Sequence, residues 1–427
     1  MRISSRDSRT AEGRPVAAGA TAFKRGTVLL YSHDSYGLGH LRRNTAISHA
    51  LLNREPSLRV VLLSGSPVAR EWPRPRGVEI VQLPVVIKVG TDRYEAAEPK
   101  SMSALRAERA GIIGSTLRRL RPDVFLVDHT PLGIKGELTH ALQMVRREFL
   151  GTKVMIGLRD VLDDAATVRR SWREQGIYRV LEDSYDRVLV YGCQDIYDVT
   201  RQYEFPPNLA RRTTFTGYIA KERGFETSVE PAKAWGQKGR RTDRRILVMG
   251  GGGGDAADLF RVFLKAWSRL ADRFRGQALL VTGPLMAPSL VDSIERRAGR
   301  IDGVTVMRSS KSILSLIAGA DLVVSMGGYN TVVEALTARK PMVLCPRVTP
   351  RTEQLIRANL MARLGLARVV QIERESSKTL ALAIEETLAA SRPTAAMWRA
   401  VDLTGGDRLA EIVLSAIGAA RSGPTAT

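Results

Sequence analysis

The chain has 427 residues, of which 44% are hydrophobic and 26% charged, and its formal net charge is +21. This length fits two domains of about 100–200 residues each. No stretch approaches the roughly 20 apolar residues of a membrane helix. Residues 1–25 lack the apolar segment of a secretory signal and are predicted to be a flexible leader. Two cysteines, Cys193 and Cys345, exclude a disulfide framework and favour a cytoplasmic protein.

The strong positive charge has three interpretations. It is typical of a solvated basic surface, of attraction to an anionic membrane face or anionic substrates, or of nucleic-acid binding. The sequence has no zinc-finger spacing, no aromatic-rich ribonucleoprotein motif and no concentrated basic helix. We therefore expect no nucleic-acid partner.

The first half of the chain alternates short apolar runs with helix-like stretches such as 41–53 and 102–120. The runs lie at 27–33, 59–65, 78–84, 123–129, 153–159 and 187–192. Short, continuously apolar strands separated by helices predict a parallel sheet that is covered on both faces.

A polar, glycine-rich and basic stretch at 221–244 interrupts this alternation and is predicted to be a linker. Apolar runs then resume at 244–250, 277–283, 303–309, 320–327, 341–346 and 366–372. A final helix is expected near 407–417, followed by a flexible tail at 421–427. The sequence therefore predicts an α/β protein with two doubly wound domains, 26–220 and 245–420, that face each other across a cleft.

Ligands of such sheets bind beyond the carboxyl ends of the strands, and the first motif lies at such an end. "SHDSYGLGHLRRN" (32–44) turns a strand into a helix through two glycines and places His40 at the helix start. All five histidines precede residue 141, so a histidine base must come from the N-terminal domain. The alternative is a glycine turn in which His40 caps or packs.

A second strand end in this domain carries "LVDHTPLG" (126–133). Asp128 and His129 are candidates to orient an acceptor or to share the role of base. A simple cap of the strand end by Asp128 remains an equal alternative.

The second motif, "VMGGGGGDAADL" (248–259), has five consecutive glycines between a strand and a helix. Such a loop exposes backbone N–H groups to an anion, so Gly251, Gly252 and Gly253 are candidate ligand contacts. The spacing matches neither a dinucleotide fingerprint nor a phosphate loop ending in Lys-Ser/Thr. The alternative is a flexible turn capped by Asp255.

The third motif, "SMGGYNTVVEAL" (325–336), leads from a strand into a helix that we expect Asn330 to cap. Gly327 and Gly328 let a diphosphate approach the free N–H groups of the first helical turn. Glu334 can accept hydrogen bonds from both ribose hydroxyls, or it merely complements the helix dipole.

The helix after the next strand is expected to open with Glu353 and Gln354. These two side chains are candidates to bind sugar hydroxyls. The alternative is a solvated first turn with no ligand.

The region 320–370 resembles the donor-binding half of family 28 and related GT-B glycosyltransferases. The matching positions are Gly327, Gly328, Thr331, Glu334, Pro346, Glu353, Gln354 and Asn359, and the glycine loop 250–254 suits the same family. The resemblance implies a GT-B fold with an N-terminal acceptor domain and a C-terminal donor domain. It also implies a nucleotide-diphosphate sugar, expected to be UDP-linked, as co-substrate, with neither a metal nor a further cofactor.

In this interpretation His40 takes the proton of the acceptor hydroxyl, and the glycine turns stabilise the leaving diphosphate. The acceptor is either lipid-linked or a small molecule, and a lipid-linked one would bring the protein into peripheral contact with the cytoplasmic face of the membrane. Two alternatives remain open. One is a nucleotide-sugar hydrolase or epimerase of the same fold. The other is a non-catalytic basic scaffold that binds an anionic polymer or membrane.

Overall fold

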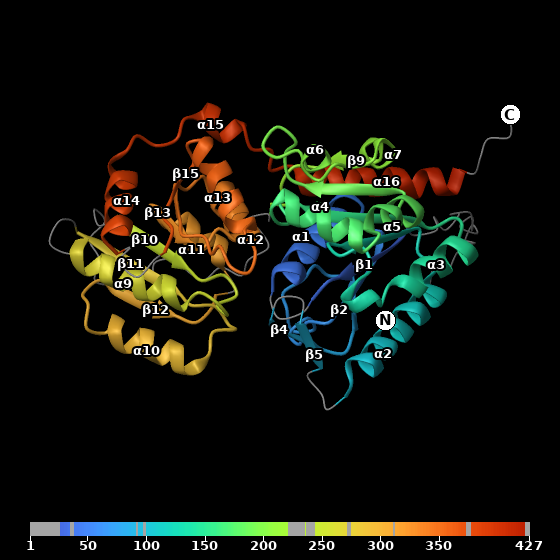
Figure 1. The fold of residues 1–427 in the computed structure, drawn as a ribbon, viewed down its shortest axis with the longest axis horizontal. Coiled ribbons are helices and arrows are strands. Elements are labelled where there is room, and N and C mark those ends of the chain that lie inside the picture. Colours follow the sequence, from blue (N-terminus) through green and yellow to red (C-terminus); the bar gives the residue numbers. More distant parts are fainter. Residues whose placement is uncertain are drawn as a thin grey trace, which may run out of the picture.

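The computed structural model of the chain describes residues 26–34, 38–90, 93–96, 100–220, 235, 244–270, 275–310, 312–372 and 377–422. The expected leader (1–25), nearly all of the expected linker (221–244) and most of the expected tail (421–427) lie outside the described residues. Figure 1 shows two lobes side by side, each built around its own sheet.

The first lobe contains a seven-stranded sheet in the order β3-β2-β1-β6-β7-β8-β9, and all neighbouring strands are parallel. Its strands are β1 (Thr27–Ser32), β2 (Arg59–Ser64), β3 (Val78–Gln82), β6 (Val124–Asp128), β7 (Lys153–Arg159), β8 (Arg187–Tyr191) and β9 (Thr213–Phe215). The central strands are buried along almost their whole length, because helices cover both faces. An antiparallel pair, β4 (Val86–Gly90) and β5 (Arg93–Ala96), lies outside this sheet.

Helices cover the two faces of this sheet unequally. One apolar cluster joins one face to α1 (Gly39–Arg54), while a second joins the other face to α2 (Met102–Leu120), α3 (Thr139–Glu148) and α5 (Ile177–Ser184). The remaining helices of the lobe are η1 (Ile134–Gly136), α4 (Ala165–Glu174), α6 (Val199–Gln202) and α7 (Pro207–Arg211).

The second lobe contains a six-stranded parallel sheet in the order β12-β11-β10-β13-β14-β15. Its strands are β10 (Arg244–Met249), β11 (Gly276–Val281), β12 (Val304–Met307), β13 (Leu322–Ser325), β14 (Met342–Leu344) and β15 (Ala367–Val369). Its helices are α9 (Ala257–Leu270), α10 (Pro288–Ala298), α11 (Ile313–Ala318), α12 (Tyr329–Thr337), α13 (Glu353–Arg363), α14 (Ser377–Ala389) and α15 (Ala395–Arg399). The predicted α/β class with two doubly wound parallel sheets is therefore confirmed.

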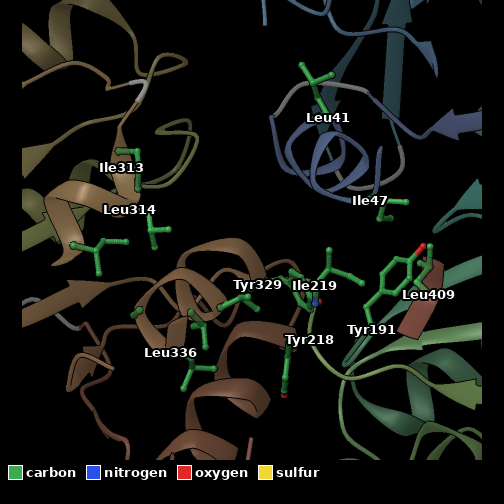
Figure 2. Close-up of a cluster of buried hydrophobic side chains, with 14 of the residues drawn as sticks. Leu41, Ile47, Tyr191, Tyr218, Ile219, Ile313, Leu314, Tyr329, Leu336 and Leu409 are labelled. Carbon is green, nitrogen blue, oxygen red and sulfur yellow. The ribbon is translucent and has the colours of Figure 1, made fainter. Parts of the chain in front are cut away.

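The two lobes share one apolar cluster. It runs from the α1 side of the first sheet to the α12 side of the second, and Figure 2 shows Tyr218, Ile219 and Tyr329 between the two sides. The Ile219 N–H donates to the Tyr329 hydroxyl oxygen at 3.1 Å, and Ile219 also bridges to Thr404. The chain thus crosses between the lobes twice, and the two crossings are bonded to each other.

The last helix, α16 (Gly405–Ser422), returns to the first lobe. It packs mainly on α1 and also contacts β6 and β7 (Figure 1). The sequence places this helix in the domain 245–420 because it follows that domain in the chain. The structure instead covers the first sheet with it, since the buried side of α1 needs an apolar partner.

Candidate functional site

The start of α1 carries the histidine predicted as a base. His40 lies in the first turn of the helix, and its Nδ1 is 2.7 Å from Oδ2 of Asp128, the last residue of β6. Strands β1 and β6 are adjacent and parallel, so their carboxyl ends bring these two residues to the same edge. The structure therefore joins two candidates that the sequence separates by 88 residues.

Asp128 is a fully buried carboxylate surrounded by donors. Arg43 donates to it from Nε and Nη2 at 2.8–3.1 Å, and the Asn44 amide donates at 3.0 Å. Although burial opposes ionisation, Arg43 and His40 hold the pKa of Asp128 well below its usual range. Asp128 is thus part of a buried charge network rather than a simple cap of the strand end.

This ionised carboxylate determines which nitrogen of His40 carries the hydrogen. Arg43 Nη2 also lies 2.9 Å from Nδ1, but the contact with ionised Asp128 is shorter and two lone pairs would repel each other at 2.7 Å, which favours an Nδ1–H that donates to Asp128. Burial lowers the pKa of His40 below 6.5, although Asp128 raises it in part. Near neutral pH the ring is therefore uncharged and its Nε2 can accept a proton.

Three imidazoles gather at this edge. The ring centroid of His40 is 5.5 Å from those of His33 and His129, which are 5.8 Å from each other. His129 has a φ of 77°, in the left-handed region, and its buried Nδ1 has no hydrogen-bond partner. Burial, followed by the charge of Arg159, holds the pKa of His129 well below 6.5. His129 is thus a neutral neighbour of the His40–Asp128 pair.

The third motif forms the turn between β13 and α12, as predicted. Gly327 has a φ of 81°, and a side chain on Gly328 would enter open space. The Asn330 prediction is wrong in detail: Gly328 is the N-cap, and the Asn330 amide instead donates to the Gly39 carbonyl of the first lobe at 3.0 Å. The start of α12 therefore directly faces the start of α1.

Glu334 lies one turn further along α12, only 4% exposed. One carboxylate oxygen accepts a hydrogen bond from Arg42 of α1, while the other is buried without a partner. Thr331 is also buried in α12. The role of both residues in ligand binding stays a prediction.

The glycine loop before α9 combines two structural roles. Gly253 has a φ of 95°, and a Cβ there would lie 2.5 Å from the Thr282 carbonyl, so packing requires a glycine. Gly251, by contrast, is exposed and has open space around it, and Gly252 is half-buried. Their role as ligand contacts, like that of Gly253, stays a prediction.

Glu353 and Gln354 open α13 but are buried rather than solvated. Arg347 binds Glu353 at 3.0 Å and Asp255 at 3.2 Å, and its backbone N–H donates to Oε1 of Gln354. The second oxygen of Glu353 is buried without a partner. Arg347 thus connects the glycine-loop region to the start of α13.

Sequence reasoning did not find the ion pairs and hydrogen bonds that connect the lobes. Arg357 of α13 forms two hydrogen bonds with the Asp160 carboxylate, at 2.7 and 2.8 Å, and also donates to the Gly327 carbonyl. Asp163 accepts hydrogen bonds from the backbone and hydroxyl of Thr352. The only local indication of such contacts is the pair of adjacent arginines in "HLRRN", Arg42 and Arg43. No sequence pattern shows which acids they pair with.

Within the described part of the chain, no group of three or more His, Cys, Asp or Glu side chains is arranged to hold a metal ion. The expectation that the reaction needs no metal remains a prediction. No described helix combines the length and apolar character needed to cross a bilayer.

Two parallel Rossmann-like sheets that face each other, with these motifs at their carboxyl edges, define the GT-B class. The calicheamicin glycosyltransferase CalG4 superposes with a TM-score of 0.62 at 16% identity, over 94% of this chain and 100% of that one. A UDP-GlcNAc 2-epimerase from Methanocaldococcus jannaschii gives 0.61 at 12% identity, over 92% and 99%. At such identities the likeness shows the fold, and it confirms the predicted GT-B architecture.

The sequence comparisons identify a family within the GT-B class that part of the chain resembles. Residues 245–411 match the glycosyltransferase family 28 C-terminal domain, so the predicted resemblance to family 28 is confirmed for this part of the chain. A UDP-N-acetylglucosamine–N-acetylmuramyl-(pentapeptide) pyrophosphoryl-undecaprenol N-acetylglucosamine transferase from Oceanobacillus iheyensis is 30% identical over 138 residues, which are 32% of this chain. The match spans 36% of that relative's length.

Proposed function

We propose that the protein transfers a sugar from a nucleotide-diphosphate donor to an acceptor hydroxyl. The observation that carries this proposal is the direct opposition of two helix starts. The His40–Asp128 pair lies at the start of α1, and the glycine turn of α12 faces it closely enough for Asn330 to bind the Gly39 carbonyl. This opposition supports a base on one lobe and a diphosphate cradle on the other.

The chemistry follows from these positions. His40 Nε2 accepts the proton of the acceptor hydroxyl while Asp128 holds the imidazole and stabilises its charged form. The hydroxyl oxygen then forms a bond to the anomeric carbon, and the bond from that carbon to the diphosphate oxygen breaks. The free N–H groups of the first turn of α12 and its helix dipole stabilise the negative charge of the leaving diphosphate.

Glu334 is proposed to bind the ribose of the donor nucleotide. Arg42 donates to one of its oxygens and the other lacks a partner. Ribose hydroxyls would satisfy the orphaned oxygen and compete with Arg42 for the other. Arg42 would then be released towards the diphosphate, whose charge it complements.

The relatives support the choice of substrates without fixing it. The transferase of Oceanobacillus iheyensis is named for UDP-N-acetylglucosamine and a pyrophosphoryl-undecaprenol acceptor, which favours a UDP sugar here. CalG4, in contrast, is named for the small molecule calicheamicin. We propose a UDP sugar as donor, a lipid-linked or small-molecule acceptor, and a place in the cytoplasm, at the inner face of the membrane if the acceptor is lipid-linked.

Nucleotide binding tests this proposal. Glu334→Gln should weaken UDP binding by about 10- to 150-fold in calorimetry, because hydrogen bonds to a charged group are worth roughly 1.5–3 kcal/mol. Glu386→Gln is the matched control, since Glu386 forms a surface ion pair with Arg368 in the same lobe. Equal UDP affinity in wild type and Glu334→Gln would contradict the role of Glu334, and a wild type that binds no nucleotide would contradict the transferase.

Incubation with the donor alone separates the reactions that share this fold. A transferase should leave the UDP sugar largely intact until an acceptor is added. Rapid release of free sugar and UDP would indicate a hydrolase, and conversion to another UDP sugar would indicate an epimerase, as in the neighbour from Methanocaldococcus jannaschii. A basic scaffold would do neither, and it would bind an anionic polymer with steep salt dependence.

A further inference from the structure

One arginine at the edge that carries the histidines has no acid of its own. Arg159 is the last residue of β7, which pairs with β6. Just after β6, the backbone N–H of His129 donates to the Gly157 carbonyl at 2.8 Å. The Arg159 side chain is half-buried. Its Nε is buried without a hydrogen-bond partner, and its guanidinium forms no ion pair with another described residue.

Four other arginines of this region differ from Arg159. Each of these four is paired with a carboxylate, in the pairs Arg42–Glu334, Arg43–Asp128, Arg347–Glu353 and Arg357–Asp160. Arg159 forms no such pair with a described residue, and Glu353 acts on it only as a nearby charge.

The electrostatics agree with this geometry. Burial, together with the charges of Arg43, Arg357 and Arg351, lowers the pKa of Arg159 to about 10, although Glu353 opposes this in part. A buried charge without a counter-charge is unfavourable, and an anionic ligand beside it would relieve this cost.

The surroundings of Arg159 indicate which ligand would carry the anion. After burial, Arg159 is the strongest influence that lowers the pKa of His129, and the His129 ring is 5.5 Å from that of His40. Arg159 therefore lies on the side of the cleft where the base acts. The donor diphosphate is assigned instead to the turn of α12 on the opposite lobe.

We propose that Arg159 forms an anion-binding subsite that holds a phosphate or carboxylate group of the acceptor close to the hydroxyl that His40 deprotonates. The assignment of this anion to the acceptor rests on the proposed function, whereas the binding of an anion does not. Glu353, which interacts with Arg159 and has an orphaned oxygen, would repel a second anion and accept a hydroxyl. The subsite thus fits a sugar-like acceptor with one anionic group and free hydroxyls.

The experiment uses the full chain labelled with ¹⁵N at its five histidines. Inorganic phosphate is titrated at constant ionic strength, with and without saturating UDP, and the imidazole resonances are followed. We expect a saturable shift of the His129 signals in wild type that persists in the presence of UDP. Arg159→Gln should weaken phosphate binding about tenfold or more, whereas Arg159→Lys should retain part of it.

Arg179→Gln is the control, because Arg179 is an exposed arginine paired with Asp183 on the same lobe. This variant should bind phosphate like wild type. Arg159→Gln should keep or raise the apparent melting temperature, because it removes a partly buried charge that forms no ion pair with a described residue. A fall of several degrees would instead indicate a structural ion pair and overturn the proposal.

The two titrations separate the ways in which the proposals can fail. Identical His129 shifts in wild type and Arg159→Gln would overturn the anion subsite. A phosphate shift that disappears when UDP binds would assign Arg159 to the donor diphosphate and overturn its acceptor role. If UDP does not bind at all, the transferase proposal fails, while the phosphate titration of the free protein still tests Arg159.

Discussion

His40 shows how a single side chain can be prepared for proton transfer. The proposed function predicts that His40→Asn lowers turnover by about 10²–10⁴-fold, the usual contribution of a general base, with UDP affinity unchanged. Initial rates and calorimetry on the same samples measure both. His140→Asn is the control, since His140 is an exposed residue of α3. Wild-type turnover in His40→Asn would remove this residue from the mechanism.

The pH dependence of kcat/KM reports on the same residue. A base must be deprotonated to act, and burial lowers the pKa of His40 below 6.5, so activity should rise with pH through a midpoint below 6.5 and then level off. A midpoint above 6.5 would mean that His40 is not the titrating base.

Asp128→Asn should move this midpoint further down, because Asp128 raises the pKa of His40. The same change leaves buried Arg43 without its carboxylate, so unfolding should also require about 3–5 kcal/mol less free energy. Chemical denaturation measures this loss. Glu386→Gln, which removes a surface carboxylate, should stay within about 1 kcal/mol of wild type.

At the residue scale, the sequence predicted those site residues that belong to short contiguous motifs. Glycine turns followed by His40 or Glu334 are contiguous patterns, and the structure places both at strand ends. The pairing of Arg42 with Glu334 joins residues 292 positions apart, and no local pattern records such a contact. Asn330 was predicted to be a cap because helix propensity describes only local positions in the helix. The side chain instead donates a hydrogen bond to the opposite lobe.

At the scale of elements, the glycine loop combines a glycine that packing requires with glycines that have open space around them. Gly253→Ala should lower the apparent melting temperature, because the added Cβ would meet the Thr282 carbonyl in a left-handed backbone conformation that costs about 1–3 kcal/mol. Gly254→Ala should be nearly neutral, since its Cβ enters open space. Equal melting temperatures for the two variants in calorimetry would contradict this division.

The strands of both sheets were predictable because their apolar runs are continuous and separated by helices. Strand β9 was not, since its three residues are only half-buried and give no apolar run. The position of α16 was also unpredictable. Its apolar face predicts that it packs against a sheet or helix. It does not show which of the two apolar sheets the helix covers.

At the scale of the molecule, Tyr329 couples the lobes. The guanidinium carbons of Arg43 and Arg357 lie 5.5 and 5.7 Å from its ring centroid, and each arginine binds an aspartate of the first lobe. Cation–π contacts are worth about 0.5–2 kcal/mol each. Tyr329→Leu should therefore lower the apparent melting temperature more than Tyr329→Phe, which loses only the hydrogen bond from Ile219. Equal losses in the two variants would show that the hydroxyl, not the ring, connects the lobes.

The return of α16 to the first lobe affects how the protein is made. The base-bearing helix α1 packs on α16, and Arg54 of α1 pairs with Glu411, 357 positions later. At roughly 5–20 residues per second, a ribosome needs about 20 to 70 seconds to cover that distance. During this interval the part of α1 that contacts α16 lacks its partner. Nascent chains should therefore bind chaperones through this surface until α16 emerges, even though the strands beneath it are synthesised early.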